Sequence, residues 1–139
     1  MNWYLAAFRK YADFSGRARR MEYWMFTLIN TAIMFALAMV ATMLGIGGGA
    51  VAGDGGAIAG AFAGMLLPML WGLVTFLPGL AVSVRRLHDT NRSGLWVLVA
   101  FIPFIGAIVL LVLMLIEGAP GSNQYGENPK SGALSAAVA

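Results

Sequence analysis

The stretch SVRRLHDTNRSGLW, residues 83–96, gathers three arginines, the single histidine of the sequence and an aspartate in an otherwise apolar chain. Of the 139 residues, 60% are hydrophobic and 11% are charged. Soluble proteins typically have about 45–50% apolar and about 25% charged residues. The composition therefore predicts a protein that lies in lipid, and the local concentration of charge needs a separate explanation.

Three runs without any charged residue surround this stretch, at residues 23–53, 55–84 and 93–116. A helix needs about 20 apolar residues to cross a hydrocarbon core about 30 Å thick. Each run is long enough, so the chain is predicted to be an all-α, polytopic membrane protein with one domain over residues 1–139. The expected elements are transmembrane segments at 19–45, 57–84 and 94–116, a Gly-rich outer loop at 46–56, a basic cytoplasmic loop at 85–93, and a turn-rich tail at 117–139 with a disordered end.

The third segment has two possible forms, because Pro103 and Gly106 lie in its middle. One kinked helix would cross the membrane and place the tail outside. Two half-helices hinged at Pro103 would re-enter and leave the tail in the cytoplasm. We expect the single crossing, with the re-entrant form as the alternative.

The cations predict the orientation. Five of the nine precede residue 21 and three lie within residues 85–92, whereas the Gly-rich connection carries no cation and one acid, Asp54. Short loops rich in Arg and Lys stay in the cytoplasm. We therefore expect a cytoplasmic N-terminus and basic loop, an external Gly-rich loop, and anionic lipid headgroups rather than nucleic acid as the partner of the cations.

An amphipathic helix is predicted at residues 2–14, lying in the headgroup region before the first span. Its aromatic and small residues share one helical face, with Asn2, Arg9 and Asp13 on the other. The expected apolar face consists of Trp3, Tyr4, Ala7, Phe8, Tyr11 and Phe14.

Small residues recur every four positions in the second span, which leaves one helical face almost without side chains. Such a face lets two helix backbones approach closely in lipid. We expect the packing partner to be another helix of the same chain, a second copy being the alternative. The predicted helix-packing residues are Gly56, Gly60, Gly64 and Gly72, with Pro68 on the same face.

Catalysis and cofactor binding are not expected. His88 and Asp89 are the one adjacent acid–base pair, and with one histidine and no cysteine the chain lacks the ligands of a zinc site. Asp89, Asn91 and Ser93 are expected to shape the turn and cap the third helix. Chemistry on a lipid headgroup by His88 and Asp89 is the weaker alternative.

Four motifs carry a resemblance to a known family: FSGRARRMEYW (14–24), RRLHDTNRSGLW (85–96), PFIG (103–106) and GAPGSNQYGENPK (118–130). Together with the opening NWYL, they make the chain similar to the bacterial family called domain of unknown function 805, the small YhaH-like inner-membrane proteins. The Gly/Ala-rich segment around residues 46–64 departs from that pattern.

The resemblance implies an inner-membrane location and a joint role for the Arg-rich motifs, but no reaction. Glu22 can pair with Arg19 one turn back. If the loop at 85–93 folds against the N-terminal motif, one of its arginines is expected to form a forked pair with Asp13, Glu22 or Asp89, or with a lipid phosphate; the alternative is that these arginines only orient the chain. The protein is expected to act by assembly, with itself or with another membrane protein; the alternative is an oligomeric channel or transport component. The candidate site residues are Arg17, Arg19, Arg20, Glu22, Arg85, Arg86, His88, Asp89, Arg92, Asn123 and Tyr125.

Overall fold

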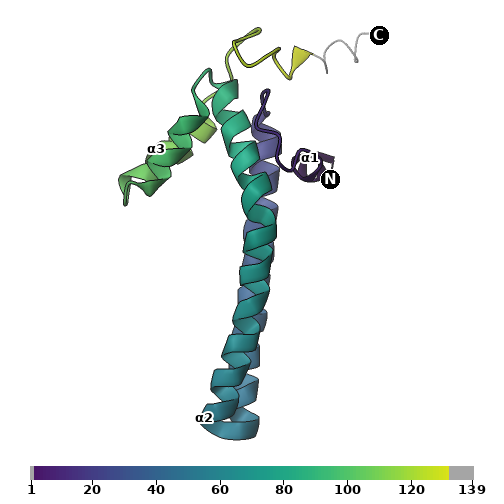
Figure 1. Cartoon of the computed structure of the whole chain (residues 1–139), viewed down its shortest axis with the longest axis vertical. Helices are drawn as coiled ribbons and strands as arrows, with labels where there is room; N and C mark the ends of the chain where they lie inside the picture. Colours follow the sequence, from purple (N-terminus) through teal and green to yellow (C-terminus); the bar gives the residue numbers. More distant parts are fainter. Residues whose placement is uncertain (1, 132–139) are drawn as a thin grey trace. The chain divides into compact units, whose positions relative to one another are not determined.

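The computed structural model describes residues 2–131 and is helical. Its elements are α1 (Asn2–Arg9), α2 (Arg20–Asp89), the 3-10 helix η1 (Gly94–Phe101) and α3 (Ile105–Leu115), coloured along the sequence in Figure 1. Within residues 2–131 there is no strand, only an isolated bridge between Asn123 and Gly126. The all-α prediction is confirmed, and the expected disordered end of the tail lies outside the described residues.

Helix α2 consists of two arms joined by a short reversal. Only Ala52 (φ −133°) and Gly53 (φ 63°, ψ −149°) leave the helical conformation. A positive φ of this kind favours glycine, which has no Cβ to clash. The predicted loop at 46–56 is therefore wrong outside these two residues. Among the other glycines of this range, Gly48, Gly49 and Gly56 lie where the arms meet, a contact that their low helix propensity does not reveal.

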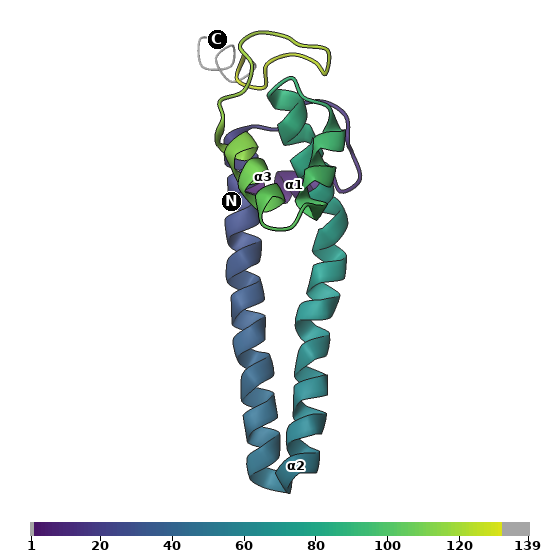
Figure 2. The same ribbon diagram turned by 90° about the vertical axis from the view of Figure 1, so that its left-hand side faces the viewer.

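The chain divides into two compact units, a hairpin unit (Thr27–Leu77) and a terminal unit formed by the residues before and after it. Within the hairpin unit the two arms run side by side (Figure 2). A Cβ on Gly60 would meet the carbonyl of Leu44, and one on Gly64 would meet the backbone of Ala41. The glycine face therefore packs within the chain.

The remaining predicted packing residues differ from one another. A Cβ on Gly56 would meet the carbonyl of Gly48, whereas nothing lies within 4 Å of one on Gly72. The prediction is thus wrong for Gly72, because the backbones approach most closely near the reversal. Farther along the arms a side-chain hydrogen bond joins them, from Trp71 Nε1 to Asn30 Oδ1 at 3.2 Å.

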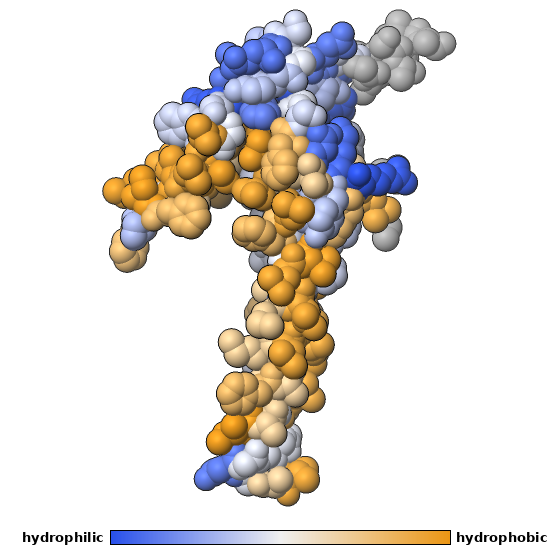
Figure 3. All heavy atoms as spheres, in the orientation of Figure 1, coloured by the Kyte–Doolittle hydropathy of each residue, from blue (hydrophilic) through white to orange (hydrophobic). Residues whose placement is uncertain are grey.

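The face of the hairpin unit seen in Figure 3 is mostly apolar, with hydrophilic atoms at its lower end. Large side chains such as Phe35, Phe62 and Phe76 are about 70% exposed, at 69%, 70% and 68%. By length and composition, α2 is the helix within residues 2–131 that could cross a membrane. An apolar surface of this extent needs lipid or protein against it.

The third predicted segment is not one helix. Ile102 is extended (φ −81°, ψ 112°) and Phe104 has a φ of 63°, so η1 and α3 are separated by a sharp turn. Proline disfavours a helical conformation for the residue before it, which explains Ile102. Gly106 packs against the carbonyl of Val99, so α3 folds back on η1. The single kinked helix over 94–116 is therefore wrong.

In the terminal unit, α1 packs on the ends of the α2 arms. Ala7 is fully buried with Phe26 and Val82, and Tyr4 and Phe8 pack against them. The helix ends at Arg9 rather than at residue 14. Tyr11 (41%) and Phe14 (38%), of the predicted aromatic face, lie beyond this end and are more than one third exposed, as is Trp3 (37%) inside the helix.

A local hydrogen bond explains why the chain turns after α1. The Asp13 carboxylate accepts from the backbone N–H of Ser15 at 3.0 Å, and also from its hydroxyl. These bonds lower the pKa of Asp13. Because a side chain that binds nearby backbone offers an alternative to the helix, the predicted helix stops short of this residue.

Candidate functional site

The charged motif quoted above begins inside a helix. Helix α2 continues through Asp89, so the basic loop predicted at 85–93 is reduced to residues 90–93. Arg85 and Arg86 are fully buried. Buried cations require acidic or carbonyl partners. Arg86 pairs with Asp89 three residues further along, but the other partners of the two side chains come from distant segments. That is why local sequence suggested a solvated loop.

Of the three residues predicted to shape and cap the turn after α2, Asn91 and Ser93 do so, whereas the prediction is wrong for Asp89, whose carboxylate binds Arg17 and Arg86. Asn91 adopts a φ of 59°, a region in which asparagine is enriched. The Ser93 hydroxyl accepts from the N–H of Leu95 at 3.3 Å and caps η1. These two residues direct the chain from the end of α2 into η1, on which α3 folds back.

Asp89 binds two arginines at once. Arg17 Nε donates to Asp89 Oδ1 at 2.9 Å, and Arg86 Nη1 donates to Oδ2. Both arginine side chains are at most 1% exposed, and the Asp89 side chain is 7% exposed. One carboxylate thus joins the C-terminal end of α2 to the segment that precedes the N-terminus of α2. We call Arg17, Arg86 and Asp89 the Asp89 cluster.

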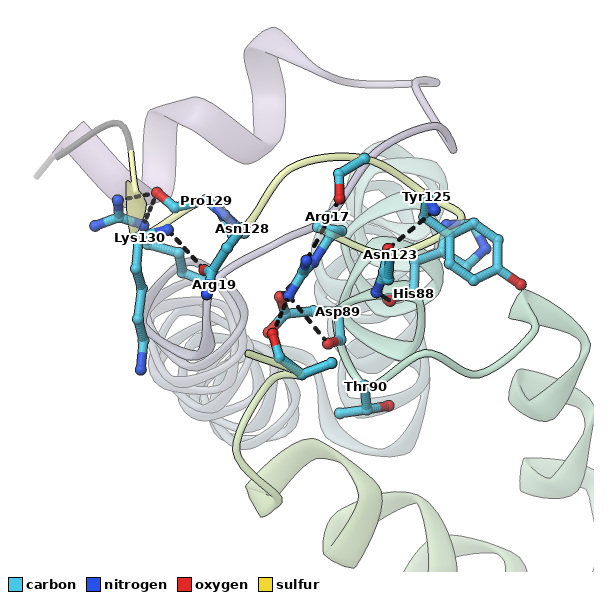
Figure 4. A network of polar contacts seen from close by, with 12 residues as sticks. Arg17, Arg19, His88, Asp89, Thr90, Asn123, Tyr125, Asn128, Pro129 and Lys130 are labelled. Carbon is cyan, nitrogen blue, oxygen red and sulfur yellow. Dashed lines mark hydrogen bonds and ion pairs between the residues drawn. The ribbon is translucent and has the colours of Figure 1, made fainter. Parts of the chain in front are cut away.

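Other donors of the Asp89 cluster bind backbone carbonyls of the tail and of the end of α3. Figure 4 shows Arg17 beside Asp89. Arg17 Nη1 donates to the carbonyl of Gly121 at 2.6 Å, and its Nη2 donates to that of Ala119 at 2.7 Å. Arg86 Nη2 donates to the carbonyl of Ile116. The planar guanidinium suits this use, because its donors can serve several acceptors at fixed angles.

Gly118 is required where the tail crosses the cluster. A Cβ at this position would fall on the Asp89 carboxylate. The N–H of Ala119 donates to the backbone carbonyl of Asp89 at 2.8 Å. Sequence reasoning missed Gly118 and the carbonyl acceptors, since every residue carries a carbonyl and its type gives no signal.

A second buried ion pair joins the two ends of α2. Arg85 Nη1 donates to Glu22 Oε1 at 2.6 Å. The expected pairing of Glu22 with Arg19 is therefore wrong. Arg19 instead lies over the ring of Trp3, 5.3 Å from its centroid, and its Nε donates to the carbonyl of Pro129 at 2.8 Å. A partner that is distant in the sequence prevails here because it is buried, whereas the local pair would be solvated.

His88 and Tyr125 form a stacked pair. Their ring centroids are 3.8 Å apart with planes inclined by 2°. Asn123 Nδ2 donates to the carbonyl of His88 at 2.9 Å (Figure 4). His88 Nδ1 lies 3.2 Å from the carbonyl of Gly16. The structure thus places the tail residues Asn123 and Tyr125 against the end of α2. The His88 side chain contacts Tyr125 and the Gly16 carbonyl, and the Asp89 side chain binds Arg17 and Arg86.

Two predicted site residues stay outside the network. Arg20 is exposed and Arg92 is half-buried. Neither side chain has a hydrogen bond or ion pair in the part of the chain that the structure describes. At the edge, Lys130 Nζ pairs with Glu117 Oε1 at 2.7 Å and lowers the pKa of that carboxyl, but both are exposed and such pairs stabilise little. Within residues 2–131, no group of three potential metal ligands occurs.

Comparison with known proteins gives relatives along nearly the full chain. The inner membrane protein YhaI of Escherichia coli strain K12 is 48% identical over 132 residues, covering 95% of this chain and 98% of its own. The inner membrane protein YhaH of the same organism is 42% identical over 130 residues, covering 94% of this chain and 98% of its own. No solved structure matches.

The family described as "Protein of unknown function (DUF805)" matches residues 11–127. This range contains every residue of the Asp89 cluster, the Arg85 and Glu22 pair, and the stacked His88 and Tyr125. The resemblance inferred from the four motifs is confirmed, and the chain belongs to the family of proteins of unknown function called DUF805.

Proposed function

We propose that this chain is a multi-pass protein of the bacterial inner membrane whose hairpin unit crosses the bilayer twice. The two arms of that unit are each about 36 Å long at 1.5 Å per residue, which exceeds the roughly 30 Å hydrocarbon core. Their apolar exposed surface suits lipid. Two relatives that cover nearly the whole chain are inner membrane proteins.

The proposed orientation has both ends of the chain in the cytoplasm. All nine cations belong to the terminal unit, and the hairpin unit carries Asp54 as its one charged residue, close to the reversal. The positive-inside rule therefore favours a cytoplasmic terminal unit and an external reversal. The bonds of Arg17 to Ala119 and Gly121 hold the start of the tail beside the N-terminal motif, on the same side.

Helices η1 and α3 are proposed to dip into the bilayer without crossing it. At about 2.0 Å and 1.5 Å per residue, each is about 16 Å long, roughly half the hydrocarbon core. The turn between them, at residues 102–104, leaves backbone groups outside helical hydrogen bonding. Non-helical backbone at membrane depth is tolerated where protein covers it.

The uncovered surface of this pair supports a role in assembly. No residue of η1 is buried, and Leu95, Phe101 and Phe104 are 73%, 82% and 90% exposed. We therefore propose that the protein is non-enzymatic and acts by assembling, with itself or with another membrane protein, through η1 and α3. This exposed apolar turn is the observation on which the proposal depends.

Cysteine labelling tests the topology, and the absence of cysteine from the chain makes single variants straightforward. We expect a membrane-impermeant maleimide added to intact spheroplasts to label Asp54→Cys, and to label Asn91→Cys and Glu127→Cys only after lysis. External labelling at position 127 with protection at 91 would restore the single crossing of residues 94–116.

Cross-linking tests the assembly. A photoreactive residue at Phe101 should capture a second polypeptide in native membranes more efficiently than one at Phe76, which is similarly exposed on the hairpin unit. The proposal would be contradicted if both sites captured only lipid, to the same extent, and if the protein were a monomer in lipid nanodiscs. Solute flux through liposomes containing the purified protein would favour the channel alternative instead.

A further inference from the structure

A pocket of about 600 Å³ opens in the terminal unit where α2 begins. Its lining combines three cations with two apolar side chains: Arg19, Arg20, Met21, Trp24 and Lys130. Ligand pockets usually enclose about 300–1,000 Å³. The volume is thus sufficient for the polar end of an organic molecule.

The three cations differ in how firmly they are held. Arg19 is fixed between the Trp3 ring and the carbonyl of Pro129, and Figure 4 shows it beside Pro129 and Lys130. The exposed Arg20 side chain has no hydrogen bond or ion pair within residues 2–131, so its donors are available. Lys130 binds the exposed Glu117, a pairing that an anion of higher charge can replace.

The backbone at this edge also favours an anion. Arg19 is the N-cap of α2 and supplies no side-chain acceptor to the first turn. The free N–H groups and the dipole of a helix N-terminus add to the attraction that guanidinium and ammonium groups exert on phosphate. The electrostatic preference of the pocket is therefore for a phosphate group.

The apolar part of the lining selects among phosphate compounds. Met21 is 56% exposed, and Trp24 is partly buried with its ring edge-on to that of Tyr23, 5.5 Å between centroids. Tryptophan and arginine side by side are typical of the membrane interface, where an amphipathic ring contacts the upper acyl chain while a cation contacts the headgroup. A free phosphate ion would leave this apolar lining without a contact.

We propose that this pocket is a binding site for the phosphate headgroup of an anionic phospholipid. Arg20 and Lys130 bind the phosphate, and the firmly held Arg19 lines one side of the pocket. The inference rests on the membrane location proposed above and goes beyond it, because it assigns a specific lipid site to named side chains. General attraction of a basic surface to an anionic membrane would involve all exposed cations alike.

Native mass spectrometry of the full chain, released from detergent, tests the site. The probes are phosphatidylglycerol, the zwitterionic phosphatidylcholine, and glycerol 3-phosphate as a soluble phosphate without acyl chains. We expect one phosphatidylglycerol to be retained, with at least about tenfold weaker binding in Arg20→Gln and in Lys130→Gln, since each loses a charged hydrogen bond. The matched control is Arg92→Gln, which removes the same charge outside the pocket.

Each other outcome overturns the proposal. An equal loss in Arg92→Gln would show attraction by net charge alone, and equal binding of phosphatidylcholine would remove the role of charge. Binding of glycerol 3-phosphate as tight as that of the lipid would reassign the pocket to soluble phosphates. The assay in detergent is independent of orientation, so its failure is distinguishable from a failure of the topology, which the cysteine labels measure separately.

Discussion

Replacing Asp89 with asparagine is expected to lower the free energy of unfolding by about 3–5 kcal/mol, the usual cost of removing one partner from a buried ion pair. Asparagine has nearly the same shape, so the loss comes from charge. Arg17 and Arg86, both at most 1% exposed, would remain buried without a counter-ion. The amide nitrogen of asparagine would also direct its own N–H donors towards one of the two guanidinium groups.

Thermal and denaturant unfolding of the purified protein in lipid nanodiscs measures this loss. Glu127→Gln is the matched control, because it removes the same charge from an exposed tail residue and should change stability by less than about 0.5 kcal/mol. Arg86→Lys should fall between them, since lysine keeps the charge but not the additional bond to the carbonyl of Ile116. If Asp89→Asn unfolds like the control, the cluster does not stabilise the protein.

Replacing Gly60 with leucine is expected to destabilise the hairpin unit by about 3 kcal/mol, at the upper end for an overpacked contact. The Cβ of any side chain at this position would fall on the Leu44 carbonyl. Backbone cannot give way as a flexible side chain can, so the arms must separate along the whole close contact. The apolar exposed surface would be unaffected, and insertion into the membrane should persist.

Gly72→Leu is the matched control for this change. It adds the same side chain to the same arm at a position where nothing lies within 4 Å of the new Cβ. We expect its unfolding temperature in nanodiscs to match that of the wild type. Equal destabilisation by both variants would attribute the effect to leucine in the helix rather than to the approach of the backbones.

The site shows which kinds of contact a sequence can predict. Ser93 and Asn91 were identified because capping and turn formation act over a few residues, through the chemistry of the residue itself. The pairing of Arg17 with Asp89 joins positions 72 apart in the chain. Nothing in the local sequence distinguishes Asp89 from any other acidic residue as the partner of Arg17. For Glu22, likewise, the sequence offers only the nearby Arg19, one helical turn away, whereas the true partner, Arg85, is distant in the sequence.

By itself the sequence determined the helical class, the apolar character of the long segments, the small-residue face of the second arm and the family to which the chain belongs. These properties follow from composition, from periodicity and from motifs that are read along the chain. Tertiary structure alone decided that residues 46–56 are almost wholly helical, because only the opposite arm shows that Gly48, Gly49 and Gly56 serve close contact rather than a loop. It also decided that α3 folds back on η1 and that the tail lies on the Asp89 cluster, because backbone carbonyls, which carry no mark of residue type, receive the arginine donors.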